Sequence, residues 1–224
     1  LPGFEEGLFT VQDVSSCLCV EAAAVKSTDL VMDLCAAPGG KTILAAEKAE
    51  RVLSFDLSEE KVDLIRENLG RMKLTNVTAA RQDAAEFHAE FENKADVVIM
   101  DVPCSGLGVT GKKRDIKYRV TKESVESLIR LQRKIVNAGW RYVKPGGILI
   151  YSTCTVNSAE NEEMAAWIAQ NFPLEPIDLK KSLPGQLVRE LTGVSAIGEN
   201  YVQLLPGFTH ADGFFFAGFR RRFS

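Results

Sequence analysis

Short apolar runs alternate with longer amphipathic stretches along most of this 224-residue chain. The runs predict strands at 29–34, 51–57, 76–84, 95–101 and 147–154, with two later strands at 201–207 and 213–222. Helical spacing of apolar residues follows at 41–48, 59–74, 158–172, and from Lys122 to the Lys-Pro-Gly-Gly sequence at 144–147. Strands that alternate with helices predict an α/β fold whose mostly parallel sheet is buried on both faces.

The size and composition of the chain fit one large globular domain, since 46% of its residues are hydrophobic. The longest apolar runs, such as GILIY and FFFAGF, are far shorter than the roughly 20 residues that a membrane helix needs. No signal-peptide pattern opens the chain. We therefore expect a cytoplasmic protein with no membrane partner, and the sequence indicates no particular oligomeric state.

The cysteines are odd in number and widely scattered, without paired C-x-x-C elements or nearby histidines. This pattern argues against a disulfide framework and against a metal site, so we expect reduced thiols. The five are Cys17, Cys19, Cys35, Cys104 and Cys154.

The charge balance gives no general attraction to nucleic acid, because the net charge is −3 and the sequence pI is near 5.6. Two local basic clusters stand out, at 112–114 and 220–222. Each is interpreted either as a solvated surface segment or as a contact for an anionic partner.

Polar residues close the predicted strands. Asp33, Asp56, Asp83 and Asp101 stand at the ends of the first four strands, and Cys154 stands at the end of the fifth. The carboxyl ends of parallel strands meet at one edge of a sheet, where active sites of such folds lie. We therefore expect these side chains to project into one crevice.

The sequence CAAPGGKT at 35–42 follows the first strand and admits three interpretations. A P-loop would need glycine at the position of Cys35, and the dinucleotide fingerprint G-x-G-x-x-G is not present. A tight Gly-rich turn followed by Asp56 instead favours an adenosine-containing cofactor without a polyphosphate, with the carboxylate accepting hydrogen bonds from a ribose. S-adenosylmethionine is the favoured cofactor, ahead of a nucleotide or a purely structural turn.

Three motifs resemble a known family: DLCAAPGGKT, DVPCSGLG and STCTVNSAENE, in this order and spacing. They closely resemble the RNA cytosine-5 methyltransferases of the Sun/RsmB/NSUN type. The resemblance extends over nearly the whole chain, and RDIKYR at 114–119 is similar to the ribosomal-RNA branch. It implies a Rossmann-like class I methyltransferase fold with a seven-stranded, mostly parallel sheet whose last strand is antiparallel. Residues 1–28 are then a helical lead-in, and 29–224 the catalytic domain.

The implied reaction is methyl transfer from S-adenosylmethionine to C5 of a cytosine in RNA, with ribosomal RNA favoured over transfer RNA. C5 is a poor nucleophile, so a cysteine thiolate must first add to C6. The family pattern makes Cys154 this nucleophile, and it makes Cys104 the thiol that helps to release the product. The alternative is that both cysteines are small buried hydrophobic residues.

The remaining roles also come from the resemblance. Asp56 is expected to hold the ribose, Asp83 to reach the adenine amino group, and Asp101 to lie between the methionine part and the cytosine. Lys41 is either an electrostatic stabiliser of the thiolate or only a charge at the start of a helix. The methionine end of the cofactor is expected to contact the backbone of Cys35, Ala36, Ala37, Pro38, Gly39, Gly40 and Lys41.

The substrate RNA is the point at which the chain departs from the family pattern. Family members usually carry RNA-binding segments before the catalytic domain, and this chain begins at LPGFEEGLFTVQD without an initiator Met, so we expect a fragment of a longer protein. Two other functions stay open. One is a methyltransferase that acts on DNA or a small molecule, and the other is a P-loop-like nucleotide-binding module.

Overall fold

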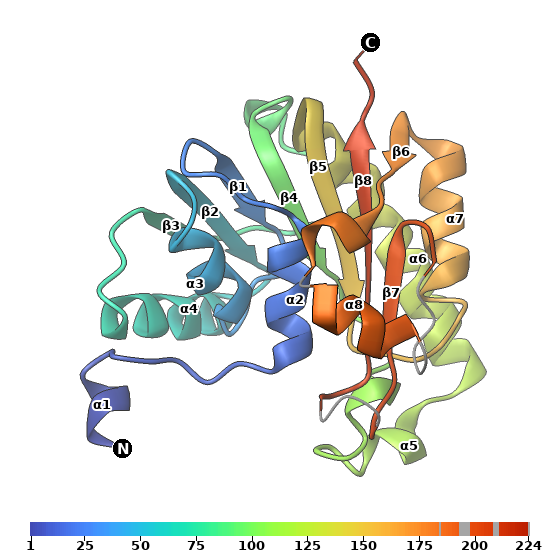
Figure 1. The fold of residues 1–224 in the computed structure, drawn as a ribbon, viewed down its shortest axis with the longest axis horizontal. Helices are drawn as coiled ribbons and strands as arrows, with labels where there is room; N and C mark the ends of the chain where they lie inside the picture. Colours follow the sequence, from blue (N-terminus) through green and yellow to red (C-terminus); the bar gives the residue numbers. More distant parts are fainter. Residues whose placement is uncertain (184, 193–197, 208–210, 224) are drawn as a thin grey trace.

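The computed structural model describes residues 1–183, 185–192, 198–207 and 211–223. Within this part of the chain, eight strands form one sheet in the order β3-β2-β1-β4-β5-β8-β6, with β7 also paired to β8 (Figure 1). Neighbours from β3 to β5 are parallel, and β8 is antiparallel to β5, β6 and β7. The strands are β1 Leu30–Asp33, β2 Arg51–Asp56, β3 Val77–Arg81, β4 Ala95–Asp101, β5 Val143–Thr153, β6 Leu174–Pro176, β7 Tyr201–Leu204 and β8 Phe214–Arg221.

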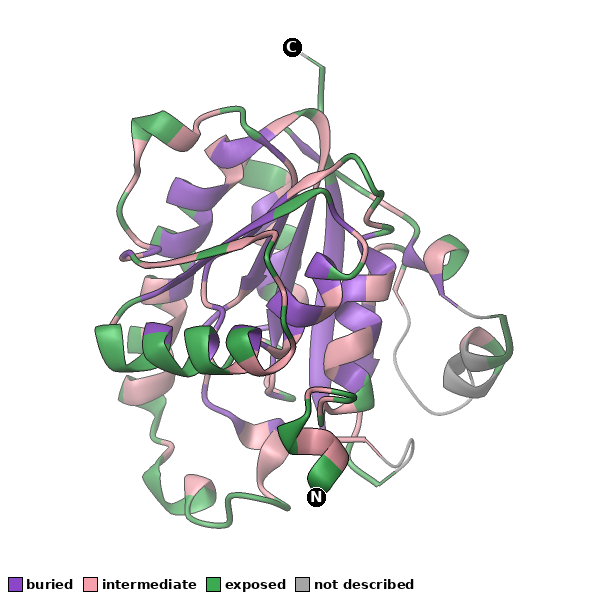
Figure 2. Cartoon of the chain, turned by 90° about the vertical axis from the view of Figure 1, so that its left-hand side faces the viewer, coloured by how far each residue is buried: buried purple, intermediate pink, exposed green. Residues whose placement is uncertain are grey.

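Helices cover both faces of the sheet. The longer ones in the described residues are α2 Val14–Ala22, α3 Gly40–Ala46, α4 Glu59–Arg71, α6 Lys122–Gly139, α7 Glu162–Asn171 and α8 Gly185–Thr192. The short ones are α1 Pro2–Glu5 and α5 Ile116–Arg119, with 3-10 turns η1 Ala89–Phe91, η2 Leu107–Val109, η3 Trp140–Tyr142 and η4 Leu179–Ser182. Figure 2 shows buried strands between these layers.

Most of the core lies in two apolar layers, one on each face of the sheet, and a smaller third cluster joins Ile43 of α3 to Ile65 of α4. On one face, Ile135 and Val136 of α6 and Ile168 of α7 pack with β4 and β5. On the other, Leu18 of α2 and Ala45 of α3 pack with β1, β2 and β8. Strands buried on both faces need apolar residues at successive positions, which is the pattern of β4 and of the end of β5.

The predicted α/β class and the antiparallel last strand are confirmed, whereas the predicted number of seven strands is wrong. Both β6 and β7 pair with the same side of β8, β6 near one end and β7 near the other. The sheet therefore has seven positions, and the last position is shared by two short strands. The three-residue segment 174–176 carries too few apolar residues to predict a strand from its pattern.

The predicted end of the long helix is also wrong, although its start is confirmed. Thr121 caps α6 with a reciprocal bond pair to Ser124. The helix ends at Gly139, and the Lys-Pro-Gly-Gly sequence lies inside β5, where the register with β4 shifts between Ala95 and Val97. Pro145 and the glycines thus belong to a strand irregularity and not to a helix stop.

The N-terminal segment lies against the domain through Arg71 of α4. The guanidinium of Arg71 lies 3.8 Å from the ring centroid of Phe4 and donates to the carbonyls of Phe4 and Phe9, each at 3.0 Å. Asp13 then caps α2, whose Cys19 is fully buried, while Cys17 is half-buried. In the described residues, no helix combines the length and apolar character needed to span a bilayer.

Candidate active site

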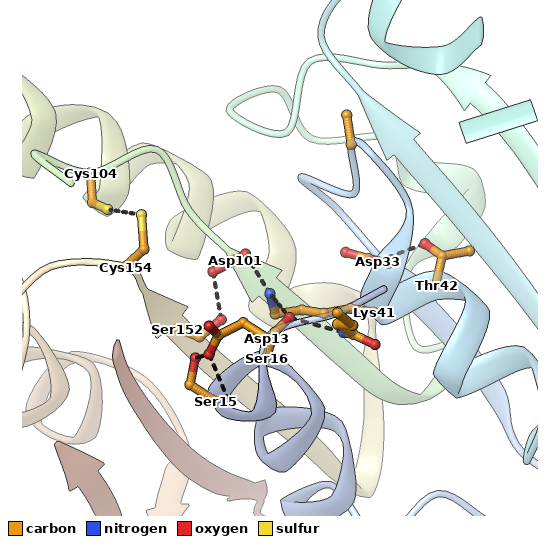
Figure 3. Close-up of polar contacts among 12 residues, drawn as sticks. Asp13, Ser15, Ser16, Asp33, Lys41, Thr42, Asp101, Cys104, Ser152 and Cys154 are labelled. Carbon is orange, nitrogen blue, oxygen red and sulfur yellow. Dashed lines mark hydrogen bonds and ion pairs between the residues drawn. The ribbon is translucent and has the colours of Figure 1, made fainter. Parts of the chain in front are cut away.

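Two thiols meet where β4 and β5 end. Asp101, the last residue of β4, is in register with Ser152 near the end of β5, so the loops after these strands start side by side. Cys104 and Cys154 lie on these loops, and their Sγ atoms are 3.4 Å apart (Figure 3). The backbone N–H of Gly108 also donates to the carbonyl of Cys154 at 3.0 Å, which ties the first loop to the second.

The two thiols have opposite pKa shifts. The hydrogen bond from Cys104 lowers the pKa of Cys154, and it outweighs the burial that raises it. The same bond and burial raise the pKa of Cys104 well above its ordinary value. A thiolate that accepts a hydrogen bond from a neutral thiol is stabilised, so one proton shared by the pair belongs on Cys104. Of the two thiols, Cys154 is therefore the one favoured to ionise.

A buried ion pair lies behind the thiols. Lys41, at the start of α3, places its Nζ 2.6 Å from Oδ2 of Asp101, and it also donates to the Ser16 hydroxyl of α2 at 2.8 Å (Figure 3). Ser152 donates to Oδ1 of Asp101 at 3.0 Å. Burial lowers the pKa of Lys41, but the charge and hydrogen bond of Asp101, together with the charges of Cys19 and Asp33, outweigh it and raise the pKa overall. The Coulomb field of Lys41 helps to lower the pKa of Cys154. Lys41 is therefore a buried cation of the site, not a solvated charge at a helix start.

A cavity of about 270 Å³ opens beside this pair. Both thiols line it, and so do Asp56, Asp83 and Asp101. Its walls are otherwise mainly apolar, with Leu34, Ala84, Leu131 and Ile135 among them. A concave apolar site with a few convergent polar groups is the usual form of a small-ligand site.

A second cavity of about 230 Å³ adjoins the first, because Cys35, Ala37 and Asp101 line both. Most of the predicted Gly-rich loop lines it, including Ala36, Pro38, Gly40 and Lys41. Gly39 lines neither cavity. It occupies the left-handed region with φ of 106° at the N-cap of α3, a conformation that favours glycine. The loop turns sharply there, which brings its backbone along the second cavity.

The two predicted cofactor carboxylates lie at the ends of neighbouring strands. Asp56 is buried and accepts from the backbone N–H groups of Ala37 and Leu57, and Lys61 lies 3.0 Å from its Oδ1. Asp83 accepts from the backbone N–H of Ala85 at 2.9 Å. Both side chains are thereby oriented at the wall of the same cavity.

The prediction that Asp33 projects into the crevice is wrong. Its side chain has no solvent exposure, accepts a hydrogen bond from Thr42 at 2.8 Å, and lines neither cavity. Burial raises its pKa to about 7. The side chains of a strand alternate between faces, and the one at position 33 points under α3 instead of beyond the strand end.

Sequence reasoning assigned no role to two residues that the structure brings to the site. Ser16 binds Lys41, and Glu160 bonds to the loop that carries Cys104. Glu160 stands inside the STCTVNSAENE motif, which was the available signal for it. Among the described residues, no cluster of His, Cys, Asp and Glu is suited to hold a metal ion.

Comparison with known proteins identifies the family. The model of the 16S rRNA methyltransferase RsmB/F family matches residues 20–220. The chain belongs to this family. It is 36% identical over 221 residues to ribosomal RNA small subunit methyltransferase B of Citrobacter koseri, which covers 97% of this chain and 48% of that protein. It is 38% identical over 225 residues to the probable ribosomal RNA small subunit methyltransferase B of Bacillus subtilis, with coverage of 98% and 49%. The chain thus spans about half the length of these curated relatives.

Solved structures give the same result for the fold. NSun6 from Pyrococcus horikoshii, solved with SFG, matches with a TM-score of 0.84 and 27% identity over 100% of this chain and 56% of that one. A methyltransferase homolog protein from the same organism matches with a TM-score of 0.79 and 29% identity, covering 99% and 70%. An S-adenosylmethionine-dependent O-methyltransferase from Thermotoga maritima shares only the fold, at 16% identity and a TM-score of 0.58 over 96% of this chain and 67% of that one. The fold is the class I methyltransferase fold.

Proposed function

We propose that this chain transfers a methyl group from S-adenosylmethionine to C5 of a cytosine in RNA, through a covalent bond between Cys154 and C6 of the base. The observation that carries the proposal is the pair of thiols 3.4 Å apart at the wall of the cavity, with a lowered pKa on Cys154 and a raised pKa on Cys104. Such a reaction needs one ionised thiol that adds to C6 and a second group that accepts the C5 proton before the first thiol is eliminated.

The two adjoining cavities fit a cofactor with an adenosine end and an amino-acid end. Asp56 and Asp83 line the first cavity, where their carboxylates are acceptors for ribose hydroxyls and an adenine amino group. The loop at 35–41 lines the second and offers backbone contacts to the methionine end. Asp101 lines both and so lies beside the junction. The cofactor, when bound, supplies an electrophilic methyl group on a sulfonium.

Cys154 begins the reaction on the base. Its thiolate adds to C6, and the electron pair of the C5–C6 double bond moves to C5, which becomes nucleophilic enough to take the methyl group. Asp101, held by Lys41 and Ser152, is within the same cavity and can hydrogen-bond the base. After transfer, a proton leaves C5, the double bond forms again, and the bond between Sγ of Cys154 and C6 breaks.

Cys104 fits the second half of this sequence. In the free protein its pKa is raised mainly by the hydrogen bond to Cys154. Once the sulfur of Cys154 is bonded to carbon, it carries no negative charge, so this cause is removed and Cys104 ionises more easily. Cys104 then loses its proton to solvent, and its thiolate is suited to accept the C5 proton, which permits elimination and returns the thiolate to Cys154.

RNA is the proposed substrate because the relatives named above are ribosomal RNA methyltransferases. The basic segment 112–122 begins a few residues after Cys104 and carries six Lys and Arg residues against one Asp, while the whole chain has a net charge of −3. Ile116 packs beside Gly106 of the Cys104 loop, since a Cβ at position 106 would lie 3.1 Å from its Cδ1, so this part of the segment lies next to that loop. We propose that this segment contacts phosphates of the RNA. Ribosomal RNA remains favoured over transfer RNA.

The domain boundaries stay part of the proposal, with residues 1–28 as lead-in and 29–224 as catalytic domain. The alternatives are a DNA or small-molecule methyltransferase, and a P-loop-like module. Family membership favours methyl transfer over the P-loop alternative.

The test is transfer of radiolabelled methyl groups to total RNA, DNA or a metabolite extract, followed by bisulfite sequencing of the labelled RNA. Label in DNA or small molecules alone would refute the RNA assignment, and labelled RNA without 5-methylcytosine would refute the C5 assignment.

A further inference from the structure

Glu160 is a buried acidic residue just before α7. Its side chain has no solvent exposure, and both carboxylate oxygens accept hydrogen bonds. Oε1 accepts from the backbone N–H of Ser105 at 2.9 Å and from Nε2 of Gln132 at 2.9 Å. Oε2 accepts from the hydroxyl of Ser105 at 2.5 Å and from Nδ2 of Asn157 at 3.3 Å. Four donors on one buried side chain suit an ionised carboxylate, which only accepts.

Three of the four donors come from the two loops that carry the thiols. Ser105 directly follows Cys104, and Asn157 lies three residues after Cys154. The loops are also joined to each other, because the hydroxyls of Ser105 and Thr155 lie 2.7 Å apart. Since the Ser105 hydroxyl donates to Glu160, Thr155 is the donor in this second bond. The residue after each cysteine is thus connected, directly or through one hydroxyl, to the carboxylate of Glu160.

The rest of the network fixes Glu160 itself. Tyr151 of β5 donates its hydroxyl hydrogen to the carbonyl oxygen of Glu160 at 2.7 Å. Gln132 of α6 donates from Nε2 to the carbonyl of Pro103 at 3.0 Å as well as to the carboxylate. Tyr151 of β5 and Gln132 of α6 therefore fix the position of Glu160, and the two thiol loops are hydrogen-bonded to its carboxylate.

We propose that Glu160 is a positioning residue that holds the Cys104 and Cys154 loops together and sets the contact between their two sulfur atoms. The inference rests on the proposed function, which requires both thiols in one reaction, and it names the group that keeps them paired. Glu160 itself does not touch the reacting atoms. Its effect reaches them through Ser105 on one side and Thr155 on the other.

A carboxylate is required here and an amide is not equivalent. In a Glu160→Gln variant, one oxygen is replaced by an NH2 group, which then faces either the Ser105 N–H and Gln132 or the Asn157 amide. Each orientation sets two donors against each other in a buried place, and at least one loop loses its bond. Cys154 then loses part of the hydrogen bond that favours its thiolate.

The test compares Glu160→Gln with the control Glu163→Gln, which makes the same chemical change at an exposed position in the first turn of α7. Alkylation of Cys154 by iodoacetamide is followed by peptide mass spectrometry from pH 6 to pH 10. The rate at which diamide oxidises Cys104 and Cys154 to a disulfide, with diamide reduced to its hydrazine, reports their proximity. Both assays use the free protein without RNA or cofactor.

We expect the Glu160→Gln profile to shift to higher pH, with alkylation at pH 7 roughly fivefold slower, the effect of one lost hydrogen bond to the thiolate. Disulfide formation should slow at least about tenfold, since small misplacements of reacting atoms are costly. Glu163→Gln should match the parent in both. Ser105→Ala, which keeps the carboxylate and three of its four donors, should fall between, and it decides the question if Glu160→Gln fails to fold.

Parent-like profiles and diamide rates in folded Glu160→Gln, or in Ser105→Ala if the first variant does not fold, would overturn the proposal. An equal slowing in Glu163→Gln would also overturn it, because the effect would not be specific to the hydrogen bonds of Glu160. A failure of RNA methylation by the parent protein would overturn the proposed function and leave these thiol measurements interpretable.

Discussion

The loss of unfolding free energy expected on removing Lys41 from its ion pair with Asp101 follows from how far the two side chains are exposed. Lys41 is 9% exposed at its side chain and Asp101 is 28% exposed. Removing one partner of a buried ion pair typically costs about 3–5 kcal/mol, because the other charge stays buried and unpaired. In Lys41→Met the remaining carboxylate keeps the bond from Ser152 and reaches solvent, so we expect a smaller loss of about 2 kcal/mol of unfolding free energy.

The same change should alter the nucleophile. The charge of Lys41 lowers the pKa of Cys154 and that of Asp101 raises it, so removing Lys41 leaves the charge of Asp101 without its counterion and raises the pKa. The thiolate is present above the pKa, and a higher pKa therefore means slower alkylation of Cys154 near pH 7. Cofactor affinity should change less than this rate does.

The measurements are urea denaturation and the pH profile of Cys154 alkylation. Lys48→Met is the control, because Lys48 pairs with Glu21 at the surface, with exposures of 34% and 40%, and such pairs are worth less than about 1 kcal/mol. The reasoning is refuted if Lys41→Met is as stable as the control variant and its alkylation profile matches the parent.

Three further outcomes are expected. Asp56→Ala should weaken S-adenosylmethionine binding at least about tenfold, the effect of roughly 1.5 kcal/mol for lost bonds to a charged acceptor, and unchanged affinity by calorimetry would remove its ribose role. Charge reversal at 112–114 should weaken RNA binding and flatten its salt dependence, whereas equal methylation by the variant would make the cluster a solvated loop. Asp33 titrates near 7 when folded and near 4 when unfolded, so the folded state binds more protons between these values and its stability should fall as pH rises from about 4 to 7. Asp33→Asn should flatten that decline in urea denaturation, and an equal decline in both proteins would show that Asp33 does not cause it.

Most of the sheet could be predicted from the sequence because its strands are apolar runs and its helices keep regular apolar spacing. The run at 95–101 became β4 with the same bounds, and Thr121 capped α6 as its residue type favours. The strand β6 was missed because it has three residues with one buried side chain, so its existence depends on pairing with β8. The prediction that the Lys-Pro-Gly-Gly sequence ends the long helix was wrong because proline and glycine occur both at helix ends and at strand irregularities.

The thiol positions were foreseeable because the two motifs end neighbouring strands, whose carboxyl ends lie at one edge. The partners of the site were not. Lys41 was open to two interpretations until its 2.6 Å contact with Asp101 was known, since a lysine at a helix start is usually solvated. Glu160 gives no local signal of burial in an acidic stretch, and its donors come from positions 28 to 55 residues away in the sequence as well as from nearby Asn157. Such networks depend on tertiary packing and not on local pattern.

The central claim is that Cys154 opens a covalent cycle that Cys104 helps to close, and denaturing gel electrophoresis after incubation with RNA and S-adenosylmethionine tests it directly. Cys104→Ala should accumulate a slow-migrating, ribonuclease-sensitive band of protein bound to methylated RNA, because addition proceeds and elimination is slow. Cys154→Ala and the double variant should form no such band and should transfer no methyl group, although they still bind the cofactor. A band with Cys154→Ala and none with Cys104→Ala would reverse the two roles, and full activity without any adduct in both single variants would contradict the covalent mechanism.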